Sequence, residues 1–316
     1  MNQPKIGAAA LVLCCASALA ACGSDAPEGP TTVGPPPTSA TGASVVSWEQ
    51  FLKYAEKNAR IVNGQKVYIV EWDIPLWEHQ LHDYYVSHFV ETTKSTVDSL
   101  SAGGDNVWTN GKQLDLKYCI STSFGTANRA RMQTEMEAAT LAWMRQANVR
   151  FLYMSGEDGN CVDANANVDI PVVPFSGGGA CSFFPNQDGQ PFCSSAGRAL
   201  IIDIADIDTW STTPNPNDGL IYPNVGTFGT LQHELGHTLG LRHEHIREAN
   251  NAIANCVSEV LNPGPFRALT PYDKNSSMHY PWCDGVLTSS QNVTDLDGQG
   301  LRSLYTQPVA WYIVEE

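Results

Sequence analysis

The sequence predicts an α+β fold, from two observations. Three short runs, LKYCIS at 116–121, VRFLYM at 149–154 and ALIIDI at 199–204, are rich in β-branched and aromatic residues, as buried strands are. Residues 127–146 instead carry apolar side chains at helical spacing. The expected buried stripe of this helix is Met132, Met136, Ala139 and Trp143.

The first 22 residues predict an export signal. Lys5 gives a slightly positive start, and the apolar stretch that follows is shorter than the roughly 20 residues of a membrane-spanning helix. The sequence Leu-Ala-Ala-Cys ending at Cys22 resembles the box that is cleaved before a lipidated cysteine in bacterial lipoproteins. We therefore expect a lipid anchor at Cys22 and a location at the cell envelope, at the outer membrane because Gly23 follows. The alternative is an ordinary secretory signal without lipid.

The chain after the signal divides into a tether and two larger regions. Residues 23–45 are rich in Pro, Gly, Ser and Thr, and they predict a disordered tether. Residues 46–108 form a separate N-terminal region, with helical spacing at 47–56 and 77–89 and strand-like alternation at 66–72. A half-exposed helix face accounts for the three histidines of this region, which are His79, His82 and His88.

Composition excludes some partners. The 316-residue chain has a formal net charge of -15 and no cluster of Lys or Arg, so a nucleic-acid partner is not expected. We expect a monomer that contacts a membrane only through its lipid.

The cysteines predict disulfides. Of nine cysteines, two leave with the signal and Cys22 takes the lipid, so six remain. An even number in an exported chain indicates three disulfides, with fifteen possible connectivities. The pairing that we expect is Cys119 with Cys161, Cys181 with Cys193, and Cys256 with Cys283.

The run HELGHTLGLRH at 233–243 predicts a metal site. His233 and His237 are four residues apart and project from one face of a helix. Gly240 allows the chain to turn back, so that His243 reaches the same ion. Glu234 can reach a metal-bound water without being a ligand. A chance match to the five fixed positions is on the order of one in a hundred thousand.

This run and SSMHY at 276–280 together resemble the paired signatures of the metzincin zinc peptidases. Glu244 and the MHY triplet are most similar to the astacin-like branch. The resemblance implies a zincin-like fold, with a twisted mixed five-stranded sheet, two long helices and a smaller irregular C-terminal half. It also implies that Met278 forms the apolar floor beneath Zn²⁺ and that Tyr280 is a retractable fifth ligand.

The resemblance implies a pro-region as well. Residues 46–108 would block the cleft, and residues 109–316 would form the catalytic domain. Asp73 is a candidate for the open zinc position, as an aspartate is in astacin proforms. The alternative is an ordinary turn residue before Pro75, and the sequence favours it because the flanking glycine of the family motif is missing. Glu244 would contact a mature N-terminus or pair with Arg242 or Arg247, and His245 is expected to be structural.

Several local features complete the prediction. Thr227 or Thr230 is expected to cap the motif helix. Residues 155–194 are expected to be loop-rich, and 190–195 is a candidate edge strand for extended substrate. A helix is expected near 295–304.

The motif predicts a zinc-dependent endopeptidase that acts on peptides or proteins. Three neutral imidazoles leave the metal one open position, Glu234 acts as general base, and Tyr280 stabilises the oxyanion by the resemblance. The rival is a lipid-anchored surface binding module with a structural zinc site, which would not need Glu234. Within the enzyme class, a matrix-type or serralysin-like metzincin is the alternative, but calcium repeats and the PRCG switch are absent from the sequence.

Overall fold

A computed structural model describes residues 47–70, 73–78, 80–82, 85, 95–98, 104–186, 193–214, 219–247, 266–283, 285–286 and 288–305. These residues belong to one compact unit that begins at Ala43. The predicted signal with Cys22 and the predicted tether lie outside the described residues. Among the helices that the structure describes, none is both long and apolar enough to cross a membrane.

A five-stranded mixed sheet confirms the predicted α+β class. Its strands, in chain order, are β5 (Leu116–Ile120), β6 (Phe151–Tyr153), β7 (Ile170–Pro174), β8 (Ala180–Cys181) and β9 (Leu200–Ile202). The spatial order is β6-β5-β7-β9-β8. Three neighbouring pairs are parallel, and β8 pairs antiparallel with β9 at one edge.

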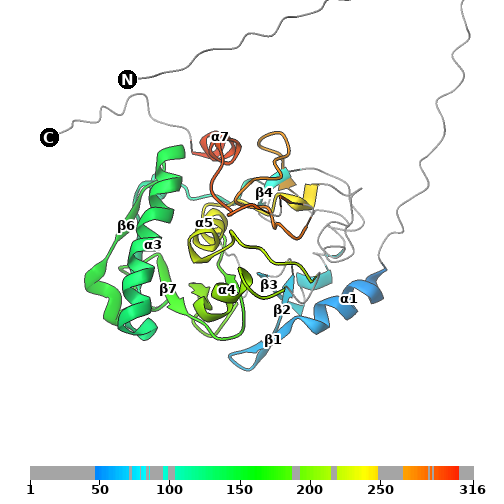
Figure 1. The fold of residues 1–316 in the computed structure, drawn as a ribbon, viewed down its shortest axis with the longest axis horizontal. Helices are drawn as coiled ribbons and strands as arrows, with labels where there is room; N and C mark the ends of the chain where they lie inside the picture. Colours follow the sequence, from blue (N-terminus) through cyan, green and yellow to red (C-terminus); the bar gives the residue numbers. More distant parts are fainter. Residues whose placement is uncertain are drawn as a thin grey trace, which may run out of the picture. The chain divides into compact units, whose positions relative to one another are not determined.

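Two long helices pack beside the sheet, as predicted. They are α3 (Gly125–Gln146) and α5 (Thr227–Thr238), which lie next to each other in Figure 1. The expected stripe of α3 is buried. Its Trp143 donates a hydrogen bond from Nε1 to the carbonyl of Gln232 at 2.9 Å. This bond and the surrounding apolar core hold the motif helix in place.

Residues 155–194 are rich in loops, as predicted, and they also contain the short strands β7 and β8. Two local predictions on the sheet and α5 are wrong. The antiparallel edge strand is β8, not 190–195; of that range Cys193 to Ser195 form bends and a turn, and the rest lies outside the described residues. Neither threonine caps α5: its N-cap is Gly226, and the Thr227 hydroxyl accepts a bond from Arg131.

The N-terminal region has a small core of its own. It contains α1 (Trp48–Lys57) and an antiparallel sheet of β1 (Ala59–Val62), β2 (Gln65–Val70) and β3 (Ile74–Trp77). The predicted helix at 77–89 lies partly outside the described residues, and its first residue, Trp77, belongs to β3. His82 is exposed beside Trp48, as a half-exposed face predicts, whereas His79 and His88 lie outside the described residues.

This region is joined to the later chain by backbone pairing. Strand β4 (Ser95–Asp98) pairs antiparallel with β10 (Phe266–Arg267). Val97 of β4 also forms a bridge with Leu241, just beyond α5. Residues before and after 108 therefore contact each other directly around the histidine motif.

Two predicted disulfides are present, Cys119–Cys161 and Cys181–Cys193. Cys283 is disulfide-bonded as well, and Cys256, its predicted partner, lies outside the described residues. The predicted C-terminal helix is α7 (Asp295–Leu304). Thr294 and Asp297 form a capping box at its start, which satisfies two backbone donors that the helix leaves unpaired.

Candidate metal centre

The three histidines of the motif converge on one point. His233 and His237 face the same way from α5, which ends at Thr238, and the chain then turns back to bring in His243. The Nε2 atom of His243 lies 3.1 Å from that of His233 and 3.2 Å from that of His237. Nitrogens that share a tetrahedral zinc ion at the usual bond length lie about 3.3 Å apart. The three rings are therefore spaced as ligands of a single ion.

Backbone carbonyls orient two of these rings. The Nδ1 atom of His233 lies 2.8 Å from the carbonyl oxygen of Ser277, and that of His237 lies 2.7 Å from the carbonyl oxygen of Leu241. A carbonyl only accepts, so Nδ1 carries the proton in both rings and donates it. This leaves the Nε2 lone pairs free for a metal, the arrangement typical of metal-binding histidines.

Gly240 makes the turn between His237 and His243 possible. Its φ angle is +94°, in the left-handed region that favours glycine, and a Cβ there would lie 2.4 Å from the carbonyl oxygen of Asn106. Both features agree with the predicted role of this residue.

We expect Gly240→Ala to lower the free energy of unfolding by on the order of 3 kcal/mol, because it adds backbone strain and a clash with backbone. Urea denaturation measures this. Gly219→Ala is the matched control: its φ is +74° but a Cβ there meets nothing within 4 Å, so a loss of about 1 kcal/mol is expected. Equal effects of the two substitutions would contradict the close approach to Asn106.

Met278 lies beneath the motif helix, as the resemblance implied. It is buried in the main core, and a Cβ on Gly236 would lie 2.2 Å from its sulfur. The turn around it is fixed by Asp297, whose carboxylate accepts the backbone N–H of Ser277 at 2.8 Å. The absence of a side chain at Gly236 is what lets the methionine approach the helix.

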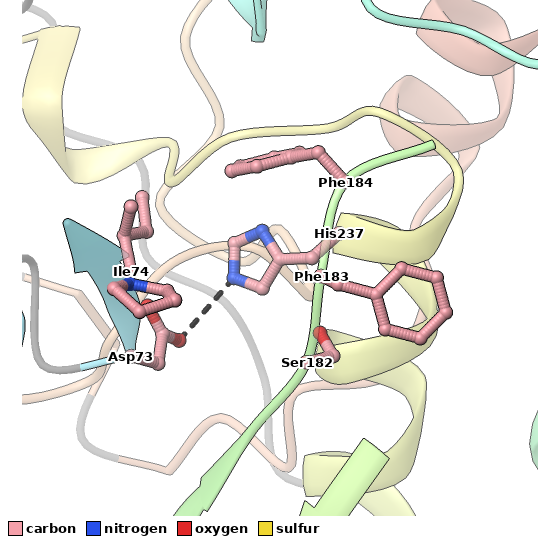
Figure 2. Close-up of a pocket in the computed structure, with 7 residues that line it drawn as sticks. Asp73, Ile74, Ser182, Phe183, Phe184 and His237 are labelled. Atoms are coloured by element: carbon pink, nitrogen blue, oxygen red, sulfur yellow. Dashed lines mark ion pairs between the residues drawn. The ribbon is translucent and has the colours of Figure 1, made fainter. Parts of the chain in front are cut away.

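Asp73 supplies a fourth donor to the site. Its Oδ2 atom lies 3.6 Å from Nε2 of His233 and 3.3 Å from Nε2 of both His237 and His243. Figure 2 shows the carboxylate directed at the His237 ring. The interpretation of Asp73 as an ordinary turn residue is therefore wrong. The N-terminal sheet brings Asp73 to the three histidines. This long-range contact forms although the chain lacks the glycine that flanks the aspartate in the astacin motif.

The donor set fits a zinc ion. All four donors are buried, and Asp73 is only 4% exposed. Its Oδ1 atom has no hydrogen-bond partner among the described residues, and a buried carboxylate with an open oxygen needs a cation nearby. Burial raises the pKa of the Asp73 carboxyl, but the neighbouring imidazoles bring this pKa well below its ordinary value. Three nitrogens and one oxygen in tetrahedral spacing are typical of Zn²⁺.

Tyr280 points to the same place. Its hydroxyl donates a hydrogen bond to Oδ2 of Asp73 at 2.9 Å, and its ring stacks on His233 with centroids 5.1 Å apart. Trp282 stacks on the tyrosine ring, with centroids 4.5 Å apart. The phenol is thus held within reach of the metal position, in the place that the resemblance implied.

Glu234 is a buried carboxyl next to the metal ligands. It is 2% exposed, and its Oε2 atom has no hydrogen-bond partner among the described residues. Burial, with the negative charge of Asp73, raises the pKa of Glu234 to about 8. Because the charge of Asp73 is one cause of the raised pKa, the pKa of Glu234 falls toward the range of a general base when that carboxylate leaves.

Glu244 and His245 hold the Met278 turn. Oε1 of Glu244 accepts the backbone N–H of Asp273 at 2.9 Å, and its own N–H donates to the carbonyl of Met278 at 2.8 Å. His245 is buried and stacks on Tyr280, with centroids 4.9 Å apart. These contacts agree with the structural role predicted for His245.

Comparison with known proteins finds metalloproteinases. No protein-family model matches the chain. Bone morphogenetic protein 1 of Xenopus laevis is 24% identical over 249 residues, which are 66% of this chain and 29% of that protein. Zinc metalloproteinase nas-5 of Caenorhabditis elegans is 24% identical over 55% of this chain and 43% of its own length. The chain thus spans less than half the length of either relative.

Among solved structures, the chain is similar to high choriolytic enzyme 1, a hatching enzyme zinc-protease from Oryzias latipes. It has a TM-score of 0.39 and 19% sequence identity, and the match covers 67% of this chain and 98% of that one. By sequence, the chain is similar to metalloproteinases of the astacin family.

Proposed function

We propose that the protein is a zinc-dependent endopeptidase of the astacin-like branch, and that it is latent while Asp73 of the N-terminal region lies at the metal position. One observation supports this most strongly: the three convergent histidines lie beside Glu234, a buried carboxyl whose Oε2 atom has no hydrogen-bond partner among the described residues. A purely structural zinc site needs no such acid beside it. The rival function, a surface binding module with a structural zinc, leaves Glu234 without a role.

In the proposed mechanism, bound zinc supplies a Lewis acid that lets water lose a proton near neutral pH and polarises the substrate carbonyl. Glu234 accepts the proton of the attacking water. The water oxygen bonds to the carbonyl carbon, the bond from carbon to nitrogen breaks, and Glu234 returns its proton to the leaving amine. The Tyr280 hydroxyl, released from Asp73, donates a hydrogen bond to the oxyanion.

Latency follows from the position of Asp73. Its carboxylate takes the fourth place around the three imidazoles and also binds the Tyr280 hydroxyl. The N-terminal region therefore engages both groups that a substrate would need. Activation requires that this carboxylate leave the site.

Location and partners follow the sequence prediction. We propose peptide or protein substrates, and export to the cell envelope with a lipid on Cys22. A monomer is expected. Labelling of cells with a radioactive fatty acid tests the lipid, with Cys22→Ser as control; equal labelling of both chains would exclude Cys22 as the modified residue.

The proposed activity is tested by incubating the Asp73→Ala chain with a mixture of peptides, with and without a chelator, and identifying the products by mass spectrometry. We expect cleavage that the chelator abolishes and that added zinc restores. Absence of cleavage in a chain that holds one zinc per molecule would overturn the proposed function.

A further inference from the structure

Phe184 connects the metal centre to the core of the N-terminal region. Its ring meets the His237 imidazole edge to face, with centroids 5.5 Å apart. It is also 5% exposed within a cluster whose other buried members all lie between residues 51 and 81 of the described chain. Phe184 is thus covered by residues that precede it in the chain by more than a hundred positions.

The residues that cover Phe184 directly follow Asp73. Ile74 and Pro75 line one small pocket together with Phe184 and His237, and Ile74 is buried. Figure 2 shows the Phe184 ring over the His237 imidazole, with Ile74 and Asp73 together on one side of that imidazole. The Phe183 ring points away from Ile74 and Asp73. The chain therefore places a carboxylate on the metal position and the next side chain against Phe184.

The residues just before Phe184 are bonded to other parts of the later chain. The hydroxyl of Ser182 donates to the carbonyl of Glu234 in α5 at 2.9 Å. Cys181, the residue before it, belongs to edge strand β8 and is disulfide-bonded to Cys193. These two bonds join residues of the later chain only, so neither of them depends on Asp73 or Ile74.

We propose that Phe184 forms a substrate subsite for an aliphatic side chain next to the cleaved bond, and that Ile74 occupies this subsite in the latent chain. This inference rests on the proposed peptidase function and adds a substrate class to it. Apart from the segment Asp73 to Pro75, the pocket is lined by Ser182, Phe183, Phe184 and His237, so no charged carboxylate or ammonium group lies in the wall that remains. A charged side chain would lose its hydration there without a partner, so the subsite selects against it.

The test uses the full chain with Asp73→Ala and Ile74→Gly, which removes the carboxylate from the metal position and the Ile74 side chain from the pocket. A peptide mixture first identifies a cleaved bond. Peptides that carry Ile, Gly or Lys at each position beside that bond are then compared. We expect kcat/KM to be about tenfold or more higher for Ile than for Gly at one of these positions, and lowest for Lys.

Phe184→Ala is expected to reduce this preference for Ile to less than about twofold. Phe175→Ala is the matched control, because Phe175 also contacts the N-terminal region, with the Arg60 guanidinium 5.1 Å from its ring centroid, but does not line the pocket. It should leave the preference unchanged. An equal kcat/KM for Ile and Gly at both positions, or a preference that survives Phe184→Ala, would overturn the subsite.

A binding measurement separates this inference from the proposed activity. Fluorescence anisotropy of a labelled peptide DIPLW, taken from residues 73–77, and of its DGPLW variant is measured on the same zinc-loaded chain. We expect about tenfold weaker binding of DGPLW, and equal binding of both peptides to the Phe184→Ala chain. Equal binding before that substitution would refute the subsite even if every peptide is cleaved. Unequal binding without any cleavage would support it while the proposed activity fails.

Discussion

Asp73→Ala is expected to raise the peptidase activity of the unprocessed chain by at least about tenfold. The carboxylate is tethered to the site, so it competes with water and substrate at a high effective concentration, which the substitution removes. It also frees the Tyr280 hydroxyl, which now donates to Asp73. Initial rates on a fluorogenic peptide, at equal zinc content, measure the effect.

Asp115→Ala is the control for this experiment, since Asp115 is a surface carboxylate paired with Lys117 and distant in sequence from the motif. Its activity should equal that of the unchanged chain. If Asp73→Ala were no more active than this control while it retained zinc, the proposed latency would be wrong.

Glu234→Gln is expected to lower kcat by about 10²- to 10⁴-fold while zinc is retained. The amide has nearly the same shape but cannot accept the proton of the attacking water, and it does not contribute a ligand to the ion. Glu234→Gln, and His237→Ala described below, should be made in the Asp73→Ala chain, so that latency does not conceal the loss of activity. Plasma emission spectrometry gives the zinc content, and casein or peptide hydrolysis gives kcat.

His237→Ala separates the two functions of the site. It removes one of the three nitrogen donors, so both zinc and activity should be lost.

Normal cleavage of casein by Glu234→Gln would rule out Glu234 as the general base and would leave the structural-zinc alternative open.

The sequence predicted the part of the site that depends on local geometry. Helical periodicity placed His233 and His237 on one face, and Gly240 indicated the turn that brings in His243. The buried stripe of α3 and the start of α7 followed from equally local patterns. Each of these features is decided within about two helical turns of the chain.

The rest depends on contacts between distant residues. Asp73 lies 170 positions before His243, and a lone Asp-Ile-Pro stretch does not indicate where a folded sheet will place it. The local sequence around Phe184 likewise indicates only a buried aromatic residue and not its contact with the metal centre. Strand β8 was missed because two residues carry too little periodicity, and its pairing with β9 defines it. The Thr227 hydroxyl was assigned to a cap, but Arg131 from another helix binds it instead.

X-ray absorption at the zinc edge, on the unprocessed full chain, tests the central claim most directly. The structure predicts one zinc per chain with three nitrogen ligands at about 2.0–2.1 Å and one carboxylate oxygen at about 2.0–2.2 Å. In the Asp73→Ala chain, the three nitrogens should remain and water should replace the carboxylate. Fewer than three imidazole ligands, or a sulfur ligand, would contradict the account.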